Sequence, residues 1–327
     1  MQIINESILE FENYLASENH LPQTPSSLYE PINYIIGLGG KRVRPALLMA
    51  SCAYSGGQIR DGLNAGFAVE IFHNFTLLHD DIMDNADTRR GQATVHKKYD
   101  VNSAILSGDS MAFIAYQYLL KYNPEISIEL ISVFSRMAIE LCEGQRLDMD
   151  FEQSEQVTIS DYLHMITNKT SVLLAACMQM GAIIAGADKA HQKHVYEFGK
   201  NIGIAFQIQD DILDTFGDAS LIGKKSGGDI SQNKKTYLYL KALELSTDQQ
   251  KEELLLLYNS NADNIDEEEK IAKVRKIFNT LVVEEYANQL KEAYMDLAIS
   301  HVRQLDIAQS FKDELIAFSE YLVKRSN

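Results

Sequence analysis

The sequence has little of what several specialised protein classes require. Its 327 residues include only three cysteines, Cys52, Cys142 and Cys177, and no tryptophan. The odd number and wide spacing of the cysteines suggest neither a disulfide framework nor a zinc site, so we expect buried thiols in a reducing compartment. Only five prolines occur. Alternating runs of β-branched residues are absent, which disfavours a protein built from β-sheets.

Positive charge is scarce as well. The chain carries 30 Lys and Arg residues against 46 Asp and Glu residues, which gives a net charge of −16. A field of this sign disfavours nucleic acids and anionic membrane surfaces as main partners. We therefore expect no nucleic-acid partner, and we expect any anionic ligand to bind in a local basic pocket.

The sequence also lacks a convincing membrane segment. Residues 170–187 carry no charge, but Thr170, Gln179 and two glycines make this stretch a poor bilayer span, and a helix buried in a bundle fits better. The first residues have neither the basic region nor the apolar region of a secretory signal. These features favour a cytoplasmic protein without a transmembrane segment.

Helical periodicity dominates what the chain does contain. The hydrophobic fraction of 46% is ample for a core, and strong helix formers are abundant. We predict an all-α fold with long helices over 63–84, 102–121, 126–150, 170–187 and 190–214. Shorter helices are expected over 234–325, with an irregular basic connection at 88–100 and a long loop at 215–235. No linker or repeat divides the chain, so we expect one domain over residues 1–327.

Two acidic motifs with the same spacing end apolar helical segments. They consist of Asp80, Asp81 and Asp84, and of Asp210, Asp211 and Asp214. On a helix, the first and last aspartates of each motif share a face about 6 Å apart, and the middle one is rotated by about 100°. A single acidic helix end is usually a solvated surface. Two such ends on facing helices favour magnesium, which takes a few carboxylates plus water and phosphate oxygens.

The few basic residues gather in loops beside these motifs. They are Lys41, Arg42 and Arg44; Arg89, Arg90, Lys97 and Lys98; Lys224 and Lys225; and Lys234 and Lys235. Because a diphosphate is held by arginine forks and metal bridges, the combination predicts two anion sites. The stretch "GDASLIGKK" is not a P-loop, since its glycines are one residue too far apart and no Ser or Thr follows the first lysine.

Five stretches of the chain carry a resemblance to a known family. They are "GGKRVRP" (39–45), "EIFHNFTLLHDDIMDNADTRRG" (70–91), "NKT" (168–170), "FQIQDDILD" (206–214) and "GKKSGGDISQNKKT" (223–236). Their order and spacing resemble the trans-isoprenyl diphosphate synthases of the polyprenyl synthetase family. The resemblance implies an isoprenoid synthase type helical bundle around a deep central cavity, usually as a homodimer. It also implies condensation of isopentenyl diphosphate with an allylic diphosphate (dimethylallyl, geranyl or farnesyl).

The resemblance assigns expected roles to individual residues. The expected ligands of about three magnesium ions are Asp80, Asp84 and Asp210. The aspartates expected to support them indirectly are Asp81, Asp211 and Asp214. The allylic diphosphate would be clamped by Arg89, Lys169, Lys224 and Lys234. Isopentenyl diphosphate would be held by Lys41, Arg44, His73 and Arg90, although His73 could instead be a hydrogen-bonded core histidine. The allylic cation would be stabilised by Thr170, Gln207 and the carbonyl of Lys169.

Product length and two rival functions depend on further residues. Phe75 and Thr76 lie about one turn before Asp80, where a bulky side chain stops chain growth in this family. The combination of a large Phe75, a small Thr76 and no insertion in the first motif resembles the pattern of archaeal-type geranylgeranyl synthases. It predicts a geranylgeranyl product, with a farnesyl product as the next candidate. Gly203 is expected to leave room on the opposite wall of the cavity. The rivals are a class I terpene cyclase, against which "GGKRVRP" and Arg90 argue, and a non-catalytic subunit, which should have lost its aspartates.

Overall fold

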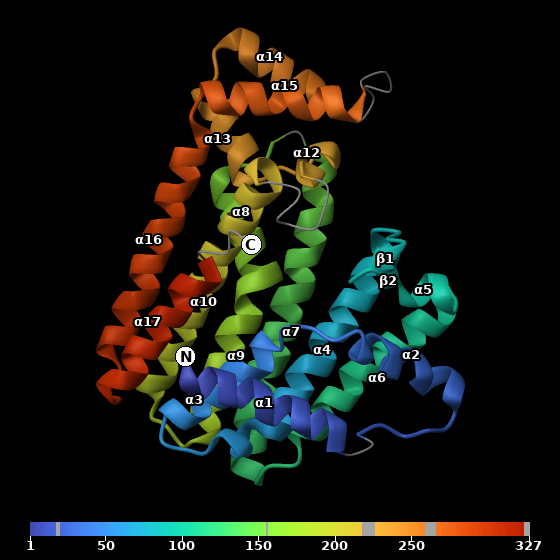
Figure 1. Ribbon diagram of the computed structural model, residues 1–327, viewed down its shortest axis with the longest axis vertical. Coiled ribbons are helices and arrows are strands. Elements are labelled where there is room, and N and C mark those ends of the chain that lie inside the picture. The colour runs from blue at the N-terminus through green and yellow to red at the C-terminus, as the bar shows by residue number, and fades with distance from the viewer. Residues whose placement is uncertain (18–19, 155, 218–225, 259–265, 324–327) are drawn as a thin grey trace. The chain divides into compact units, whose positions relative to one another are not determined.

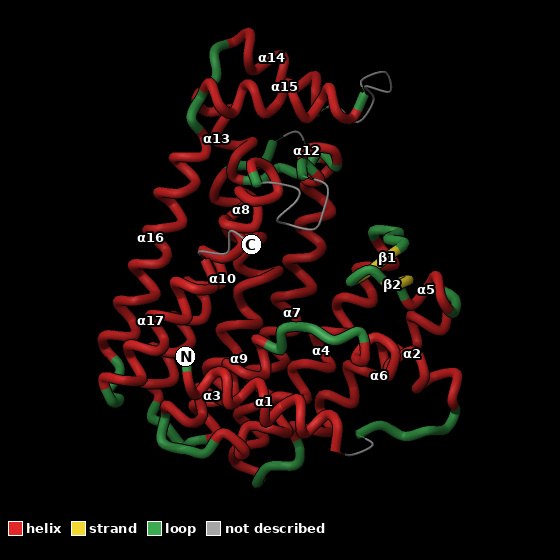
Figure 2. The backbone as a smooth tube through the Cα atoms, viewed as in Figure 1, coloured by secondary structure: helices red, strands yellow, loops and turns green. Residues whose placement is uncertain are grey.

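The computed structural model describes residues 1–17, 20–154, 156–217, 226–258 and 266–323 (Figure 1). Helices dominate these residues, and the strands among them are the two short ones of a hairpin, β1 (Thr88–Arg89) and β2 (Gln92–Ala93) (Figure 2). The all-α prediction is confirmed. Among the described helices, none combines the length and the apolarity that crossing a bilayer requires.

The chain divides into two compact units. The first unit comprises Met1–Ser135, Ala176–Tyr196 and Asp306–Phe311, and the second comprises Arg136–Ala175, Glu197–Leu305 and Lys312–Asn327. The expectation of one domain over residues 1–327 is not tested by this division and stays a prediction.

The first unit contains the N-terminal helices. They are α1 (Gln2–Ser17), α2 (Ser26–Gly37), α3 (Val43–Tyr54), the 3₁₀ turn η1 (Ile59–Gly62), α4 (Leu63–Met83), α5 (Val95–Lys98), α6 (Val101–Leu119) and the start of α7 (Pro124–Gln153). Helix α4 packs along α6, and α1 packs on α3. The side chain of Asp100 caps α6 by accepting from the backbone N of Ser103 at 2.9 Å. Buried residues such as Ile71 and Met111 form the core between these helices.

The remaining helices lie wholly or partly in the second unit. They are α8 (Ile159–Ile166), the π-helix η2 (Thr167–Ser171), α9 (Val172–Ile184), α10 (Lys189–Phe216), α12 (Gly228–Ser231), α13 (Tyr237–Leu245), α14 (Asp248–Leu257), α15 (Glu267–Thr280), α16 (Val283–Gln304) and α17 (Gln309–Val323). Helices α7, α9, α10 and α17 contribute residues to both units. A core that includes Tyr162, Ile208 and Leu238 packs α8, α10 and α13 together. Thr158 and Asp161 form a capping box at the start of α8.

Most predicted helix bounds agree with the structure to within a few residues, but several expectations were wrong. The predicted loop at 215–235 contains α12 and the last residues of α10. The uncharged segment does not begin as an α-helix, because residues 167–171 form a π-helix. The connection at 88–100 contains the hairpin and α5, because Arg90 and Gly91 both adopt positive φ values, 53° and 74°, as a tight two-residue hairpin turn requires. Of the three cysteines, Cys142 is exposed on α7 rather than buried.

Candidate active site

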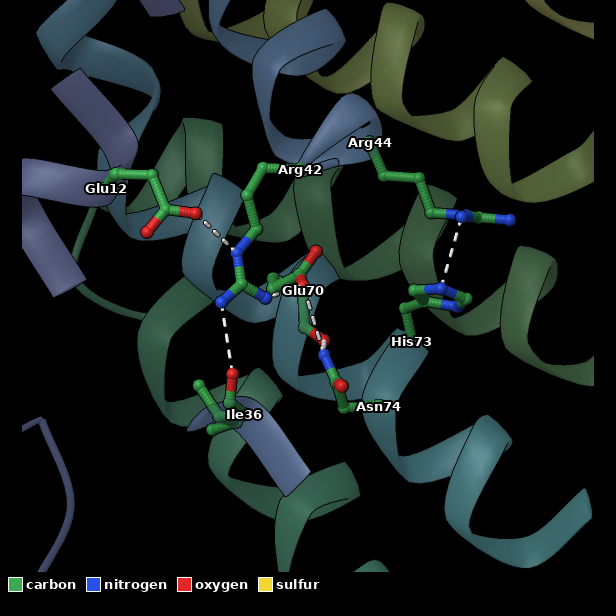
Figure 3. Close-up of polar contacts among 7 residues, drawn as sticks. All are labelled: Glu12, Ile36, Arg42, Arg44, Glu70, His73 and Asn74. Carbon is green, nitrogen blue, oxygen red and sulfur yellow. Dashed lines mark hydrogen bonds and ion pairs between the residues drawn. The ribbon is translucent and has the colours of Figure 1, made fainter. Parts of the chain in front are cut away.

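A buried arginine anchors the basic loop of the first unit (Figure 3). Arg42 precedes α3 with a φ of 48°. Its guanidinium donates to Glu12 at 2.9 Å, to Glu70 at 2.5 Å and to the backbone oxygen of Ile36 at 3.0 Å. The loop before α3 is therefore tied to α1, α2 and α4.

Arg44, two residues further on, has a different environment. Its Nη1 donates to Nε2 of His73 at 3.1 Å, and its buried Nε has no hydrogen-bond partner among the residues that the structure describes. Burial, and then the positive charges of Arg44, Arg90, Arg89 and Arg42, hold the pKa of His73 well below its ordinary value. His73 is therefore neutral, and because Nε2 accepts from Arg44, its proton resides on Nδ1.

The structure brings the residues predicted to hold isopentenyl diphosphate together. A Cβ atom on Gly40 would lie 3.1 Å from Nη2 of Arg90, so the Arg90 guanidinium lies against the "GGKRVRP" loop. Burial lowers the pKa of Arg44, and the charge of Arg90 lowers it further. Lys41 is exposed in the same loop. The four predicted residues therefore form one basic cluster at the loop before α3, and their roles in substrate binding stay predictions.

The first acidic motif ends α4, and its middle residue turns inward. Asp81 is buried, and both of its oxygens accept from Nε of Arg89, at 2.9 and 2.8 Å. Asp80 is half-buried, and Asp84 is exposed at the end of the helix. The spacing predicted this rotation of Asp81. Arg89, a predicted diphosphate clamp, pairs with Asp81 in this structure, and its predicted role stays a prediction.

The predicted chain-length residues lie on the same helix. The ring of Phe75 contacts the rings of Phe72 and His79, with centroids 5.3 and 4.7 Å apart. The hydroxyl of Thr76 donates to the backbone oxygen of His73 at 2.8 Å. Both side chains are half-buried.

The second acidic motif lies near the end of α10. Asp210 is exposed, whereas Asp211 is buried and accepts from the Tyr162 hydroxyl at 2.6 Å and from Nε2 of Gln207 at 2.9 Å. Burial and the neighbouring charge of Asp229 raise the pKa of Asp211 well above its ordinary value. Asp214 accepts from the backbone N of Asp229 at 2.9 Å and thereby fixes the start of α12.

A pocket of about 400 Å³ in the second unit gathers most of the other predicted residues. Its lining includes Lys169, Gln207, Asp210, Asp211, Asp214 and Lys234. The ammonium of Lys169 forms a salt bridge with Asp148, and Thr170 donates its hydroxyl to Oε1 of Gln207 at 3.0 Å. Lys224, the remaining predicted clamp, lies outside the described residues.

Close backbone packing positions the π-helix that carries Lys169 and Thr170. A Cβ atom on Gly144 of α7 would lie 2.2 Å from the backbone N of Lys169. On α10, a Cβ atom on Gly203 would lie 2.7 Å from Cα of Ser171. Gly203 therefore allows α10 to approach the π-helix, and the expectation that it leaves room in a cavity wall was wrong.

Sequence reasoning missed several residues of this pocket. They are Asp148, Tyr162 and Asp229. Asp148 follows Gly144 by four residues, so it shares the face of α7 that meets the π-helix. The spacing of Gly144 and Asp148 was therefore the sequence signal that could have indicated Asp148 as a pocket residue. Asp229 lies in the quoted stretch at 223–236 but was given no role, and Tyr162 had no signal, because its partner Asp211 lies on another helix.

The described carboxylates do not form a closed metal cage. No three His, Cys, Asp or Glu side chains among the described residues converge closely enough to hold an ion by themselves. Magnesium does not need such a cage, because it is bound through one or two carboxylates together with water and phosphate oxygens. The pocket concentrates negative charge from Asp148, Asp210, Asp214 and Asp229. This donor set fits a hard divalent cation that binds together with a diphosphate.

Asp229 predicts a pH-dependent stability of the metal-free protein. Burial, and then Asp214, raises the pKa of Asp229 from an ordinary value of 3.8 to about 6. The folded protein therefore keeps this proton to higher pH than the unfolded chain does, and the associated stability is lost as the pH rises from about 4 through about 6. Asp229→Asn should remove this loss and raise stability at pH 7.5 by roughly 1–2 kcal/mol.

Thermal unfolding with a chelator at pH 4.5 and pH 7.5 measures this difference. Glu152→Gln, at an exposed carboxylate that also lines the pocket, is the control and should leave the pH dependence as it is. An Asp229→Asn variant whose stability changes with pH as much as that of the unaltered protein would contradict the prediction.

The comparison with solved structures first assigns the class of fold. A crystal structure of a geranylgeranyl pyrophosphate synthase matches with a TM-score of 0.95 and 44% sequence identity, and 100% of each chain is covered. The protein therefore has the all-helical fold of the isoprenoid synthases.

The comparisons with sequences then identify the family. The model of the family described as Polyprenyl synthetase matches residues 25–278. The geranylgeranyl pyrophosphate synthase of Geoglobus acetivorans is 35% identical over 307 residues, which cover 93% of each chain. The geranylgeranyl diphosphate synthase of Sulfolobus acidocaldarius is 37% identical over 303 residues, which cover 91% of each chain. The chain belongs to the polyprenyl synthetase family and is a trans-prenyltransferase.

Proposed function

We propose that the protein is a geranylgeranyl diphosphate synthase, which condenses isopentenyl diphosphate with an allylic diphosphate and releases diphosphate. The observation that carries this proposal is the basic cluster around neutral His73, which the protein has in addition to the pocket of carboxylates and lysines. Condensation requires two diphosphate sites, whereas a terpene cyclase requires one. The names of the relatives support a twenty-carbon product, with farnesyl diphosphate as the next candidate.

The allylic diphosphate would be bound through its charged end. Its basic ligands would be Arg89, Lys169 and Lys234, together with Lys224. The aspartates that would hold magnesium on it are Asp80, Asp84 and Asp210, with support from Asp81, Asp211 and Asp214. Bound magnesium supplies Lewis-acid stabilisation of the departing diphosphate. Before substrate binds, Asp148 neutralises Lys169, so the diphosphate would compete with Asp148 for this ammonium.

Isopentenyl diphosphate would be bound by Lys41, Arg44, His73 and Arg90. Neutral His73 keeps an N–H on Nδ1 that can donate to a diphosphate oxygen. Arg44 is desolvated and adjoins Arg90, so an anion would relieve their repulsion. Because the charge of Arg44 is desolvated, it is screened less than a surface charge, which strengthens its attraction for an anion.

The reaction would proceed by ionisation. The allylic C–O bond breaks, and both electrons leave on the diphosphate oxygen. The oxygens of Thr170 and Gln207 and the carbonyl of Lys169 stabilise the allylic cation. The double bond of isopentenyl diphosphate attacks this cation, and a proton is then lost. Since no side chain is an obvious base, the released diphosphate would accept that proton.

The assembly proposed is a homodimer of chains that each form one catalytic domain. The first unit contains the acidic motif of Asp80, Asp81 and Asp84, and the second unit contains that of Asp210, Asp211 and Asp214. Three apolar side chains are spaced seven residues apart: Leu106 and Phe113 on α6, and Leu120 directly after it, which are 59%, 72% and 61% exposed. An exposed apolar row of this kind is typical of a protein–protein interface. Sedimentation velocity tests the dimer, and a monomer at micromolar concentration would contradict it.

Product analysis tests the function. Purified protein is incubated with magnesium, labelled isopentenyl diphosphate and each allylic primer, and the products are measured by mass spectrometry. A ladder that ends at twenty carbons is expected. An end at fifteen carbons would keep the reaction but change the product assignment. Hydrocarbon formed from farnesyl or geranylgeranyl diphosphate alone would mean a cyclase.

Phe75→Ala is expected to lengthen the product beyond twenty carbons. The large ring would be replaced by a methyl group on the helix face that leads away from Asp80, so the growing chain would gain room there. Thr76→Phe is the opposite change and should shorten the product towards fifteen carbons. The same mass-spectrometric assay reads both variants. If neither variant alters the product distribution, Phe75 does not limit the chain.

A further inference from the structure

A chain of three hydrogen bonds runs beside the pocket of the second unit. Tyr162 of α8 donates its hydroxyl to Oδ2 of Asp211 at 2.6 Å. Gln207, one turn before Asp211 on α10, donates its Nε2 to Oδ1 of Asp211 at 2.9 Å. Thr170 of the π-helix donates its hydroxyl to Oε1 of Gln207 at 3.0 Å. The chain thus joins a core tyrosine to the two side chains proposed to stabilise the allylic cation.

The carboxylate of Asp211 sets the direction of the whole chain. Both of its oxygens accept hydrogen bonds: Oδ2 accepts from the Tyr162 hydroxyl, and Oδ1 accepts from Nε2 of Gln207. The amide of Gln207 therefore turns its NH₂ group to Asp211 and its oxygen away from it. The hydroxyl of Thr170 donates its only proton to that oxygen. The hydroxyl oxygen of Thr170 and Oε1 of Gln207 therefore present only lone pairs to their surroundings, and these are the negative ends of two fixed dipoles.

Tyr162 is well placed to hold this arrangement rigid. It is only 1% exposed and belongs to the hydrophobic core of the second unit, where its ring lies 6.5 Å from that of Tyr237. It precedes Lys169 by seven residues, on the helical segment that continues into the π-helix. Without the tyrosine hydroxyl, Oδ2 of Asp211 would lose this partner. The carboxylate would then be freer to rotate, and the amide of Gln207 would lose its fixed support.

We propose that Tyr162 is a positioning residue that acts through Asp211 to hold the oxygens of Gln207 and Thr170 toward the allylic cation. This inference rests on the proposed function. When the allylic carbon loses the diphosphate oxygen together with the bonding electrons, positive charge develops on the carbon chain. Dipoles that are already aligned need no reorganisation at that moment, which is why such groups accelerate ionisation. Tyr162 itself does not touch the reacting atoms.

Tyr162→Phe keeps the ring and removes only the hydroxyl. We expect kcat to fall about 10- to 30-fold, with the KM for isopentenyl diphosphate and the product length unchanged. The direct readout is a pair of unreactive ligands of equal length. One is a prenyl diphosphate analogue with an ammonium group in place of the ionising carbon, and the other is the neutral thiolo diphosphate. The variant should lose about tenfold in affinity for the cationic analogue and nothing for the neutral one.

A double-mutant cycle separates positioning from general damage. If Tyr162 acts through Gln207, Tyr162→Phe should have little further effect on kcat in a Gln207→Leu background. Tyr237→Phe, which alters the neighbouring ring of the same core, is the matched control and should leave the affinity ratio as it is. If Tyr162→Phe lowers kcat by the same factor in the unaltered protein and in the Gln207→Leu variant, the inference is overturned. It is also overturned if Tyr162→Phe leaves the ratio of affinities for the cationic and neutral analogues unchanged. Should the single variant fold poorly, Asp211→Asn gives the same readout, because its amide can donate as well as accept.

The unaltered protein distinguishes failure of the inference from failure of the function. If it binds the cationic analogue no better than the neutral one, the roles proposed for Thr170 and Gln207 are wrong, and the inference falls with them. If it prefers the cationic analogue and Tyr162→Phe keeps that preference, only the inference is wrong.

Discussion

Asp210→Asn is expected to lower kcat by about 10³- to 10⁴-fold and yet to leave the folded protein as stable as before or more stable. The carboxylate is exposed in a pocket that already holds several other acids, and its charge contributes to the raised pKa values of Asp211 and Asp229. Removing that charge relieves repulsion in the metal-free protein. The same charge is proposed to bind the cation that carries the diphosphate, so activity and stability should change in opposite directions.

Two measurements on one preparation test this expectation. Product formation is followed as magnesium is titrated, and thermal unfolding is recorded with a chelator. Glu152→Gln removes another carboxylate from the same pocket and should keep activity within about twofold, because we propose no metal role for it. Activity of Asp210→Asn within tenfold of the unaltered protein would exclude Asp210 as a metal ligand. A fall in stability of more than about 1 kcal/mol would exclude the electrostatic reasoning.

The sequence predicted those parts of the fold that depend on local patterns. Helices α4 and α10 follow apolar periodicity that holds over many turns, and their bounds were close. The π-helix at residues 167–171 was missed because its cause is tertiary. It lies where Gly144 and Gly203, on two other helices, allow close approach of backbones. The hairpin at 88–93 was missed because its turn is Arg90-Gly91, which is not among the usual dipeptides of such turns.

The same distinction holds for the site. Spacing alone predicted that Asp81 and Asp211 rotate away from their neighbours, and both are buried with partners of their own. The identity of those partners was not predictable. Arg89 had been expected to clamp a ligand, and Tyr162 carried no motif. Which helix faces which residue depends on packing over the whole unit, and a single sequence does not reveal it.

The two arginines of the loop "GGKRVRP" have different partners in the structure. Arg42 donates to Glu12 and Glu70, whereas Arg44, which the family resemblance assigns to isopentenyl diphosphate, donates to neutral His73 (Figure 3). We expect Arg42→Gln to cost about 3–5 kcal/mol of unfolding free energy, because Glu70, whose side chain is 6% exposed, would be left buried without its cation. The KM for isopentenyl diphosphate in the fraction that stays folded should change little.

Arg44→Gln should change substrate affinity and leave stability nearly unchanged, which is the opposite of the result expected for Arg42→Gln. The Arg44 guanidinium is desolvated, its Nε has no partner within the described part of the chain, and the charge of Arg90 lies nearby, so the loss of Arg44 should change stability by less than about 1 kcal/mol. The KM for isopentenyl diphosphate should rise about 30- to 100-fold, because a charged hydrogen bond to the diphosphate is lost. The KM for the allylic primer should stay the same. Denaturant unfolding and initial rates on the two variants measure both quantities, and each variant is the control for the other. If both variants lose stability alike, the loop is structural throughout; if both lose substrate affinity alike, Arg42 reaches the ligand as well.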